Sequence, residues 1–133
     1  TRADLTQAVL EGVAFAIRDS EEVAKSLGVL IPSSMLCGGG AKSPLWKQIM
    51  ANVLNIPLHS PASEQGPGMG GAMLAMVACG AYPDVQTVCS RLVHISSTMN
   101  PTPELAAKYE RRYQAFKQIY PACKGLFAEL VKE

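Results

Sequence analysis

Residues 34–60, which read SMLCGGGAKSPLWKQIMANVLNIPLHS, contain the pattern that decides the fold of this chain. The segment begins with a short, uncharged run, 34–37, that leads into three consecutive glycines, as a buried strand does when it ends in a tight turn. Ser43 is a good N-cap for the helix that follows, and Pro44 suits its first turn, where a missing N–H costs nothing. A second short strand is predicted over 56–59. The segment therefore predicts an α/β fold class, built on a right-handed β-α-β unit with a parallel pair of strands.

The helix of this unit is predicted to end at Asn55. Its apolar residues recur at helical spacing, and we expect that side of the helix to be buried. The residues on this side are Leu45, Trp46, Ile49, Met50, Val53 and Leu54.

A long first helix is predicted before the unit. Asp4 followed by Gln7 resembles a capping box at its start, and Gly28 is the residue expected just after its end. An apolar stripe with nearly helical spacing is expected to face the core. The stripe consists of Leu5, Val9, Val13, Ile17, Ala24 and Leu27.

Three more helices are predicted after the unit. The first, 68–79, is apolar on every side and is therefore expected to lie inside the structure. A short helix from Asp84 to about Leu92 follows, and a long one begins near Glu104, in which Pro121 is expected to kink or divide the chain. On this last helix we expect Leu105, Tyr109, Phe116 and Ile119 to face inward and Lys108, Arg111, Arg112 and Lys117 to face water.

Composition restricts the classes of partner. The chain has 133 residues, a formal charge of +1, 48% hydrophobic residues and 17% charged residues, which fits one compact domain. A charge so close to zero produces no long-range field to attract nucleic acid or an anionic membrane, so we expect neither as a partner. The uncharged stretch 65–82 contains five glycines and is shorter than the roughly 20 apolar residues of a membrane span.

The four cysteines and two histidines do not form a metal site in the sequence. No two cysteines form a C-x-x-C pair, and neither His59 nor His94 lies at ligand spacing from another histidine or a cysteine. We therefore expect free thiols, no bound metal and a cytoplasmic protein, since no secretory leader is recognisable. The chain begins with Thr1 rather than Met, which suggests a segment of a longer protein.

The glycine turn at 38–43 is the part of the sequence most suited to chemistry. A strand that ends in glycines and opens a helix exposes backbone N–H groups at the positive end of that helix, where a phosphate or a flat ring can approach. A phosphate-binding P-loop is excluded because Ala41 precedes Lys42 and Leu36 stands where the earlier glycine should be. The dinucleotide fingerprint is disfavoured because Ser43 replaces its last small residue. From spacing alone, a tight turn without any ligand remains an alternative.

Three blocks of this sequence resemble the FGGY carbohydrate kinases. Residues 39–43, with the Trp46, Gln48 and Ala51 that follow, are similar to the adenosine motif of that family. Residues 64–67 and 69–75 resemble the block that comes next in its xylulokinase branch, and the opening and tail of the chain are also similar to that branch. The resemblance covers nearly all of the chain, with the blocks in the family's order.

The resemblance implies a fold and a binding site. FGGY kinases have two actin-like, ribonuclease H-like domains, with the sugar held mostly by the N-terminal domain and ATP by the C-terminal one. Residues 1–133 would be the last portion of that C-terminal nucleotide-binding domain. The family's adenosine contacts correspond to Gly39 and Ser43, and Gly40 and Ala41 would line the same wall.

The resemblance also implies a reaction, the transfer of the γ-phosphoryl group of ATP to a ketose, with D-xylulose as the expected acceptor. Such a transfer needs Mg²⁺, which would be held mainly by the phosphates and by residues outside this chain. Asp4, Asp19 and Asp84 are the only aspartates, and none is expected near the glycines. We therefore assign no catalytic and no metal-binding residue to the chain.

Several alternatives stay open at this stage. L-Ribulokinase or gluconokinase of the same family is one, and an actin-like module that binds nucleotide without catalysis is another. The expected partners are ATP or ADP, a ketose and the N-terminal lobe of the same protein, and the chain could also form a homodimer through exposed apolar surface. We expect these residues to be inactive on their own, since half of the cleft would be missing.

Overall fold

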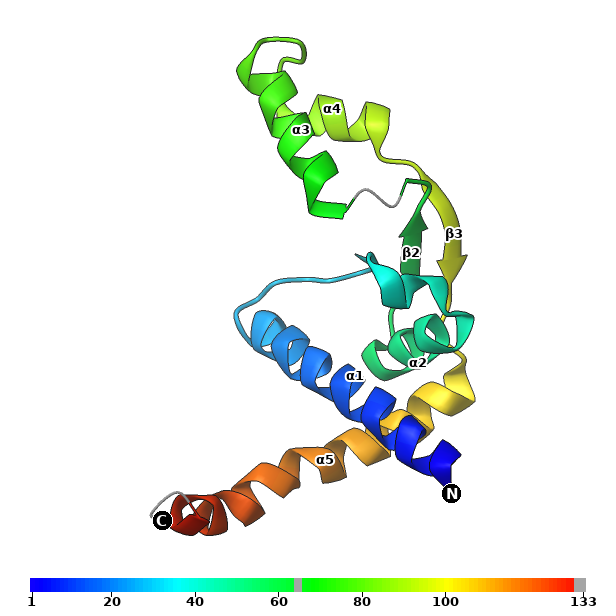
Figure 1. The fold of residues 1–133 in the computed structure, drawn as a ribbon, viewed down its shortest axis with the longest axis vertical. Helices are drawn as coiled ribbons and strands as arrows, with labels where there is room; N and C mark the ends of the chain where they lie inside the picture. The colour runs from blue at the N-terminus through cyan, green and yellow to red at the C-terminus, as the bar shows by residue number, and fades with distance from the viewer. Residues whose placement is uncertain (64–65, 131–133) are drawn as a thin grey trace.

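The computed structural model describes residues 1–63 and 66–130 of the chain (Figure 1). Glu64 and Gln65, which belong to the second motif block, lie outside the described residues. The elements follow in the order α1 (Arg2–Ser26), β1 (Ser34–Met35), η1 (Gly39–Lys42), α2 (Pro44–Leu54), β2 (Leu58–Pro61), α3 (Gly66–Ala78), α4 (Val85–Leu92), β3 (Ile95–Met99) and α5 (Pro103–Leu130).

The predicted β-α-β unit is present. β1 and β2 are parallel, with Ser34 opposite Leu58 and Met35 opposite His59, and α2 connects them. Ser43 caps α2, Pro44 occupies its first position, and Asn55 closes it in the left-handed conformation with φ 55°. These features confirm the prediction, and the two ends of α2 were predictable because they depend on the backbone preferences of only a few neighbouring residues.

The small sheet differs from the prediction in two respects. A third strand, β3, pairs antiparallel with β2 and was not predicted, so the sheet is mixed with the order β1-β2-β3. β1 has only two residues, and both are exposed rather than buried. The reason is that β1 is an edge strand, with β2 as its only neighbour among the described strands.

Helix α1 begins earlier than predicted. Thr1 is its N-cap, and Asp4 is the third residue of the helix. The two form a capping box, in which Thr1 Oγ1 accepts a hydrogen bond from the Asp4 N–H at 3.3 Å. Its end is the expected one, since Gly28, with φ 83°, donates to the carbonyl of Lys25 while Val29 donates to that of Ala24. This pair of bonds is the Schellman motif, which needs a residue that tolerates positive φ.

The face of α1 that is buried is not the predicted one. Ala14 and Phe15 are buried, with Arg18 and Glu21 on the following turns. The predicted stripe is mostly exposed: Leu5 72%, Val9 66%, Val13 48%, Ile17 41% and Leu27 77%. α2 and α5 cross α1 (Figure 1), and their core contacts fall on the side of α1 that carries Ala14 and Phe15, so that side is buried and most of the apolar stripe is left exposed.

The core lies where α1, α2 and α5 cross. Phe15 packs against three aromatic rings of α5, with centroid distances of 6.2 Å to Tyr109, 5.9 Å to Tyr113 and 5.2 Å to Phe116. α2 contributes its predicted side, with Ile49, Met50, Val53 and Leu54 buried and Trp46 half-buried against them, whereas Leu45 is 58% exposed. The core is therefore a three-helix junction beneath one end of the sheet.

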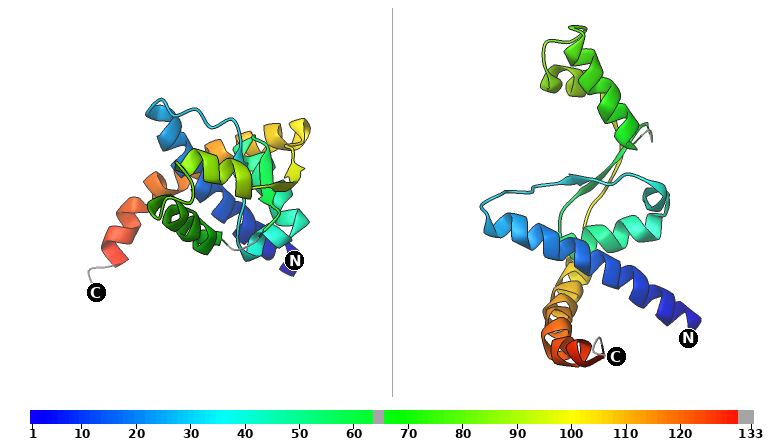
Figure 2. Two further views of the ribbon diagram at one scale, coloured as in Figure 1. Left: turned by 90° about the horizontal axis from the view of Figure 1, so that it is seen from above. Right: turned by 60° about the vertical axis from the view of Figure 1, so that its left-hand side comes forward.

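Helices α3 and α4 form a separate layer at the other end of the sheet (Figure 2). None of the residues of α3 is buried, although its apolar composition predicted an interior helix. Leu74, for example, is 59% exposed. Composition indicates that a helix can be buried, but the neighbouring elements decide whether it is, and α4 is the principal described element that packs on α3.

Helix α5 continues through Pro121, which therefore does not divide it. Its N-terminal half carries the buried residues Ala106, Tyr109 and Tyr113. Leu105 and Ile119, predicted to face inward, are 40% and 56% exposed, because α1 and α2 contact only the narrower side of α5 that carries the two tyrosines. None of the helices in the described ranges combines the length and the hydrophobicity that crossing a bilayer requires.

Candidate functional site

The glycine turn, residues 38–43, leaves β1 and enters α2 (cyan, immediately before α2 in Figure 1). Its middle four residues form the 3₁₀ turn η1. Two hydrogen bonds close it, from the Ala41 N–H to the Gly38 carbonyl and from the Ser43 N–H to the Gly40 carbonyl, both at 3.0 Å. The turn therefore has a defined shape, and it brings Gly39, Gly40, Ala41 and Ser43 together in one short segment.

Gly38 is required by the backbone itself. Its φ is 88° and its ψ is −177°, a combination that residues with a Cβ rarely adopt. This conformation turns the chain from β1 into η1. Glycine at position 38 therefore has a conformational explanation that involves no ligand.

Gly40 lies against a neighbouring side chain that leaves little room for a Cβ. A Cβ at this position would stand 3.0 Å from both Cδ1 and Nε1 of Trp46, closer than such atoms normally approach. The edge of the indole thus lies directly against the backbone of the turn. Trp46 had been expected only to pack in the helix, because contact between residues six apart depends on the path of the turn and has no signature in the sequence.

Gly39 has neither requirement. A Cβ built on Gly39 would have no atom within 4 Å, and its φ lies outside the positive range. Within the described chain an alanine would fit here without strain. The structure of the chain alone therefore gives no steric reason for glycine at position 39, in contrast to positions 38 and 40.

The turn presents hydrogen-bond donors to solvent. Gly39, Gly40 and Ser43 are exposed and Ala41 is half-buried. Among the described residues, no backbone carbonyl accepts a hydrogen bond from the N–H of Gly39 or Gly40. Two adjacent open N–H groups next to the start of a helix are suited to accept the oxygens of a phosphate or the polar edge of a nucleoside.

Ser43 has a structural role and keeps a donor. Its Oγ accepts a hydrogen bond from the Trp46 N–H at 3.3 Å and so caps α2, as predicted. A hydroxyl that accepts one bond in this way can still donate its own hydrogen to another group. Ser43 can therefore cap the helix and donate to a bound molecule at the same time.

The three aspartates are engaged elsewhere, and none lies in the glycine turn, as expected. Asp4 belongs to the first turn of α1, Asp19 accepts a hydrogen bond from the Tyr113 hydroxyl at 2.7 Å, and Asp84 caps α4. The backbone N–H of Thr87, 2.6 Å away, holds the pKa of Asp84 below its usual value. In the described ranges, no three His, Cys, Asp or Glu side chains gather closely enough to hold a metal ion.

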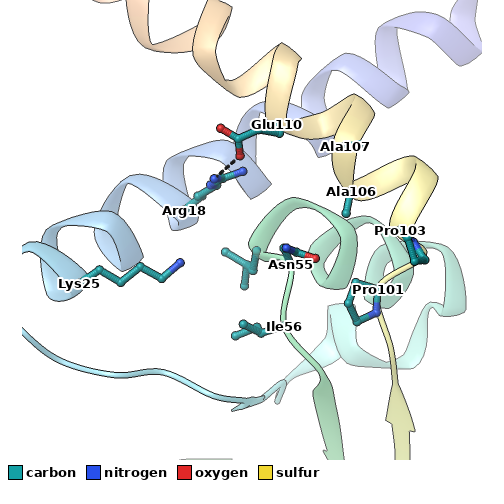
Figure 3. Close-up of a pocket in the computed structure, with 10 residues that line it drawn as sticks. Arg18, Lys25, Asn55, Ile56, Pro101, Pro103, Ala106, Ala107 and Glu110 are labelled. Carbon is teal, nitrogen blue, oxygen red and sulfur yellow. Dashed lines mark hydrogen bonds and ion pairs between the residues drawn. The ribbon is translucent and has the colours of Figure 1, made fainter.

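Three cavities of the described chain are not lined by any residue of the turn. One of about 460 Å³ lies between α1, the end of α2 and the start of α5 (Figure 3). Arg18 and Glu110 face each other there as an ion pair, and Lys25 also borders the space. Hydrogen bonds from the Gln114 amide and from Arg18 lower the pKa of Glu110, so this carboxylate stays charged and paired. The ion pair in this cavity links α1 to α5. In the glycine turn, by contrast, the N–H groups of Gly39 and Gly40 donate to no carbonyl of the described chain.

Sequence comparison places the chain among carbohydrate kinases. A family model described as "FGGY family of carbohydrate kinases, C-terminal domain" matches residues 1–79. The chain is 31% identical over 131 residues to the xylulose kinase of Staphylococcus epidermidis, covering 98% of this chain and 26% of that protein. It is 34% identical over 121 residues to a ribulokinase of Mycolicibacterium smegmatis, covering 90% of this chain and 22% of that protein. The chain thus spans about a quarter of the length of these curated relatives.

Solved structures show the same relationship. A "xyloylose kinase" from Brucella ovis superposes with a TM-score of 0.85 at 38% identity, over 95% of this chain and 26% of that one. A gluconate kinase from Lactobacillus acidophilus has the same fold, with a TM-score of 0.85 at 23% identity over 98% of this chain and 26% of that one. These structures support the actin-like fold class expected from the resemblance, with a helix-rich chain and a parallel β1–β2 pair. The chain belongs to the FGGY family of carbohydrate kinases.

Proposed function

We propose that these residues are the adenosine-binding portion of a sugar kinase that transfers the γ-phosphoryl group of ATP to a ketose, with D-xylulose as the acceptor. In this proposal they form the last part of the kinase's C-terminal domain, in a cytoplasmic enzyme. The nucleotide lies against the glycine turn, and Gly39, Gly40, Ala41 and Ser43 line its adenosine side. Membership of the family and the xylulose kinases among the relatives support this proposal.

The observation that carries the proposal is the contrast among the three glycines. The protein itself explains Gly38 by its φ and Gly40 by Trp46, but nothing within the described chain explains Gly39. A molecule that lies flat against the backbone would explain it, because a Cβ there would hold that molecule away from the turn. The open N–H groups of Gly39 and Gly40 lie at the same place.

The chain's part in the reaction is binding and orientation. Phosphoryl transfer depends on holding the nucleotide in line with the acceptor hydroxyl, and a closed, hydrogen-bonded turn at the start of a helix provides a fixed platform for that purpose. The residues fit the nucleotide, because the turn offers N–H donors and the Ser43 hydroxyl. They do not by themselves fit Mg²⁺, since the described chain gathers no set of carboxylates near the turn. When bound, the ion would neutralise phosphate charge, and its ligands would come from the phosphates and from residues outside this chain.

A ribulokinase is the second candidate. The identity of 34% to the ribulokinase of Mycolicibacterium smegmatis is as high as the identity to the xylulose kinases among the curated relatives, so similarity in this region does not separate the two acceptors. The residues that select the sugar are proposed to lie in the other lobe. A direct test with both sugars is therefore needed.

The test is an assay of the full-length protein that contains these residues. We expect ATP-dependent phosphorylation of D-xylulose, with weaker activity on L-ribulose, D-ribulose and gluconate. A reversed preference would replace the proposed acceptor by the one preferred. Loss of all phosphoryl transfer, with MgADP binding retained in calorimetry, would identify a nucleotide-binding module without catalysis.

The site itself is tested by Gly39→Ala. The new methyl group meets no protein atom, so we expect an unchanged melting temperature and a KM for MgATP raised about tenfold, because small displacements of a bound reactant are costly. Gly125→Ala on α5 is the matched control, since its methyl group also meets no atom within 4 Å. Equal KM values for MgATP in both variants would show that the nucleotide binds elsewhere.

A further inference from the structure

We propose that Trp46 is a positioning residue for the nucleotide. Its indole ring packs against the glycine turn and thereby fixes the direction of the N–H groups of Gly39 and Gly40. This inference rests on the proposed function, because it concerns the same turn. It adds a residue that would not touch the nucleotide but would determine how well the turn binds it.

The first contact that carries the inference is with Gly40. The indole edge approaches so closely that a Cβ on Gly40 would stand 3.0 Å from Cδ1 and Nε1. A gap between ring and turn would have left room for that atom. The turn therefore rests on the ring and has no space to move toward it.

The second contact is with Ser43. The backbone N–H of Trp46 donates to Ser43 Oγ at 3.3 Å, so the same residue orients the hydroxyl that we assign to nucleotide binding. Ser43 in turn donates its own N–H to the Gly40 carbonyl at 3.0 Å. Trp46 thus contacts both ends of the Gly40–Ser43 segment: its backbone N–H, which the Trp46→Ala and Trp46→Phe variants retain, holds Ser43, and its ring alone contacts Gly40.

The position of the ring is fixed by the core. Trp46 is half-buried and packs against the cluster that contains Ile49, Met50 and Val53 of α2. A large ring packed on one side against a close-packed core cannot move in that direction, because such interiors do not deform freely, and the turn that lies on the ring is restrained with it. Removal of the ring would leave the turn with its two hydrogen bonds but no surface beneath Gly40.

The expected consequence is specific to nucleotide affinity. In the full-length protein, Trp46→Ala should raise the Kd for MgADP and the KM for MgATP by about fivefold to tenfold, a loss of the size that misplaced binding groups cause. The KM for the sugar, and kcat at saturating MgATP, should stay within about twofold, because the reacting atoms are held by other residues. Trp46→Phe, which keeps a flat ring in the core, should restore most of the affinity.

Leu45→Ala serves as the matched control. Leu45 neighbours Trp46 on α2 but is 58% exposed, so its truncation alters the same helix without altering the support of the turn. Melting temperature and circular dichroism are recorded for every variant. If Trp46→Ala does not fold, Trp46→Phe and Gly40→Ala decide the question, since the latter adds a methyl group directly against the ring.

A coupling measurement gives an independent readout. Gly40→Ala should weaken MgADP binding when Trp46 is present and weaken it less in the Trp46→Phe background, where the smaller ring leaves more room. Trp46 is the only tryptophan among these 133 residues, so the difference in emission between the parent protein and Trp46→Phe should change when MgADP binds. Additive effects on binding, together with an unchanged difference spectrum, would contradict the proposal.

The two proposals fail in different ways. If Gly39→Ala weakens MgADP binding and a folded Trp46→Ala variant does not, the positioning role is wrong and the nucleotide site stands. If Gly39→Ala has no effect on MgADP binding, the site is not at this turn, and the positioning role fails with it. A Trp46→Ala variant that lowers the melting temperature but keeps the parent Kd would assign the ring a purely structural role.

Discussion

Nη1 of Arg18, in the middle of α1, donates a hydrogen bond to the backbone carbonyl of Val53, 3.1 Å away, near the end of α2. The last carbonyls of a helix lack partners within it, so a cation from a neighbouring helix both satisfies and neutralises this end. The same guanidinium pairs with Glu110 and lies 4.2 Å from the ring centroid of Tyr113. One arginine therefore joins all three helices of the core.

Replacement of this arginine should be strongly destabilising. Its side chain is only 11% exposed, so Arg18→Met leaves the Val53 carbonyl without its donor and Glu110 without its cation. A buried carbonyl left without its donor costs about 1–3 kcal/mol, whereas the half-exposed Glu110 carboxylate is solvated and adds little. Urea denaturation of the variant should show this decrease in the free energy of unfolding.

Glu110→Gln should be far milder. The Glu110 side chain is 46% exposed, and solvent screens its interaction with Arg18, so we expect a loss below about 1 kcal/mol. The same urea experiment compares the two variants. Equal losses would show that the ion pair, rather than the bond to Val53, carries the contribution of Arg18.

Asn52 should be the second polar residue on which the core depends. It is 2% exposed, and its Oδ1 accepts hydrogen bonds from the Thr102 N–H at 2.7 Å and from the Gln48 amide at 3.1 Å. Asn52→Leu buries the Thr102 N–H without an acceptor, which costs about 1–3 kcal/mol. Gln48→Ala, which keeps the Asn52–Thr102 bond, should cost less in the same denaturation assay. A neutral Asn52→Leu variant would contradict this assignment.

Alkaline pH should destabilise the three-helix core. Burial, followed by the hydrogen bond to Asp19, raises the pKa of Tyr113 well above its usual value of 10.0. Burial and the charge of Glu11 likewise raise the pKa of Tyr109. A pKa that is higher in the folded than in the unfolded chain stabilises the fold fully below about pH 10, and this contribution is lost as the pH rises further.

The measurement is thermal unfolding as a function of pH. The melting temperature should fall above about pH 10, and Tyr113→Phe should reduce the slope of that fall, because the phenylalanine cannot ionise. Ultraviolet absorbance of tyrosinate reports the ionisation directly. A slope identical in the parent and in Tyr113→Phe would exclude a role for this phenol.

Gly38→Ala and Gly39→Ala should differ in their effect on the melting temperature. Alanine at position 38 must adopt φ 88°, which costs about 1–3 kcal/mol, so the melting temperature should fall. Alanine at position 39 meets no strain, and the reduced entropy of the unfolded chain should leave stability equal or slightly higher. Calorimetric unfolding of both variants separates a glycine required by the backbone from one that the backbone does not require.

Local features of this chain could be read from its sequence. The cap at Ser43, the helix start at Asp84, the helix ends at Gly28 and Asn55, and the parallel β1–β2 pair were predicted, and all are observed. The caps and helix ends depend on the dihedral preferences or hydrogen bonding of residues within a few positions of one another, and the strand pair follows from the short β-α-β connection. The motif blocks likewise identified the family, because they are contiguous in the chain.

Burial and long-range contacts required the tertiary structure. The apolar stripe of α1 is mostly exposed and its opposite face buried, and Arg112, which faces water as predicted, also binds Glu11 at 2.7 Å. Strand β3 forms because β2 offers it an edge, and a Cβ at position 40 would be crowded because Trp46 lies against it. Sequence periodicity shows that a helix has an apolar face, but which face is covered depends on the elements that cross it, and those crossings are set only when distant segments pack together.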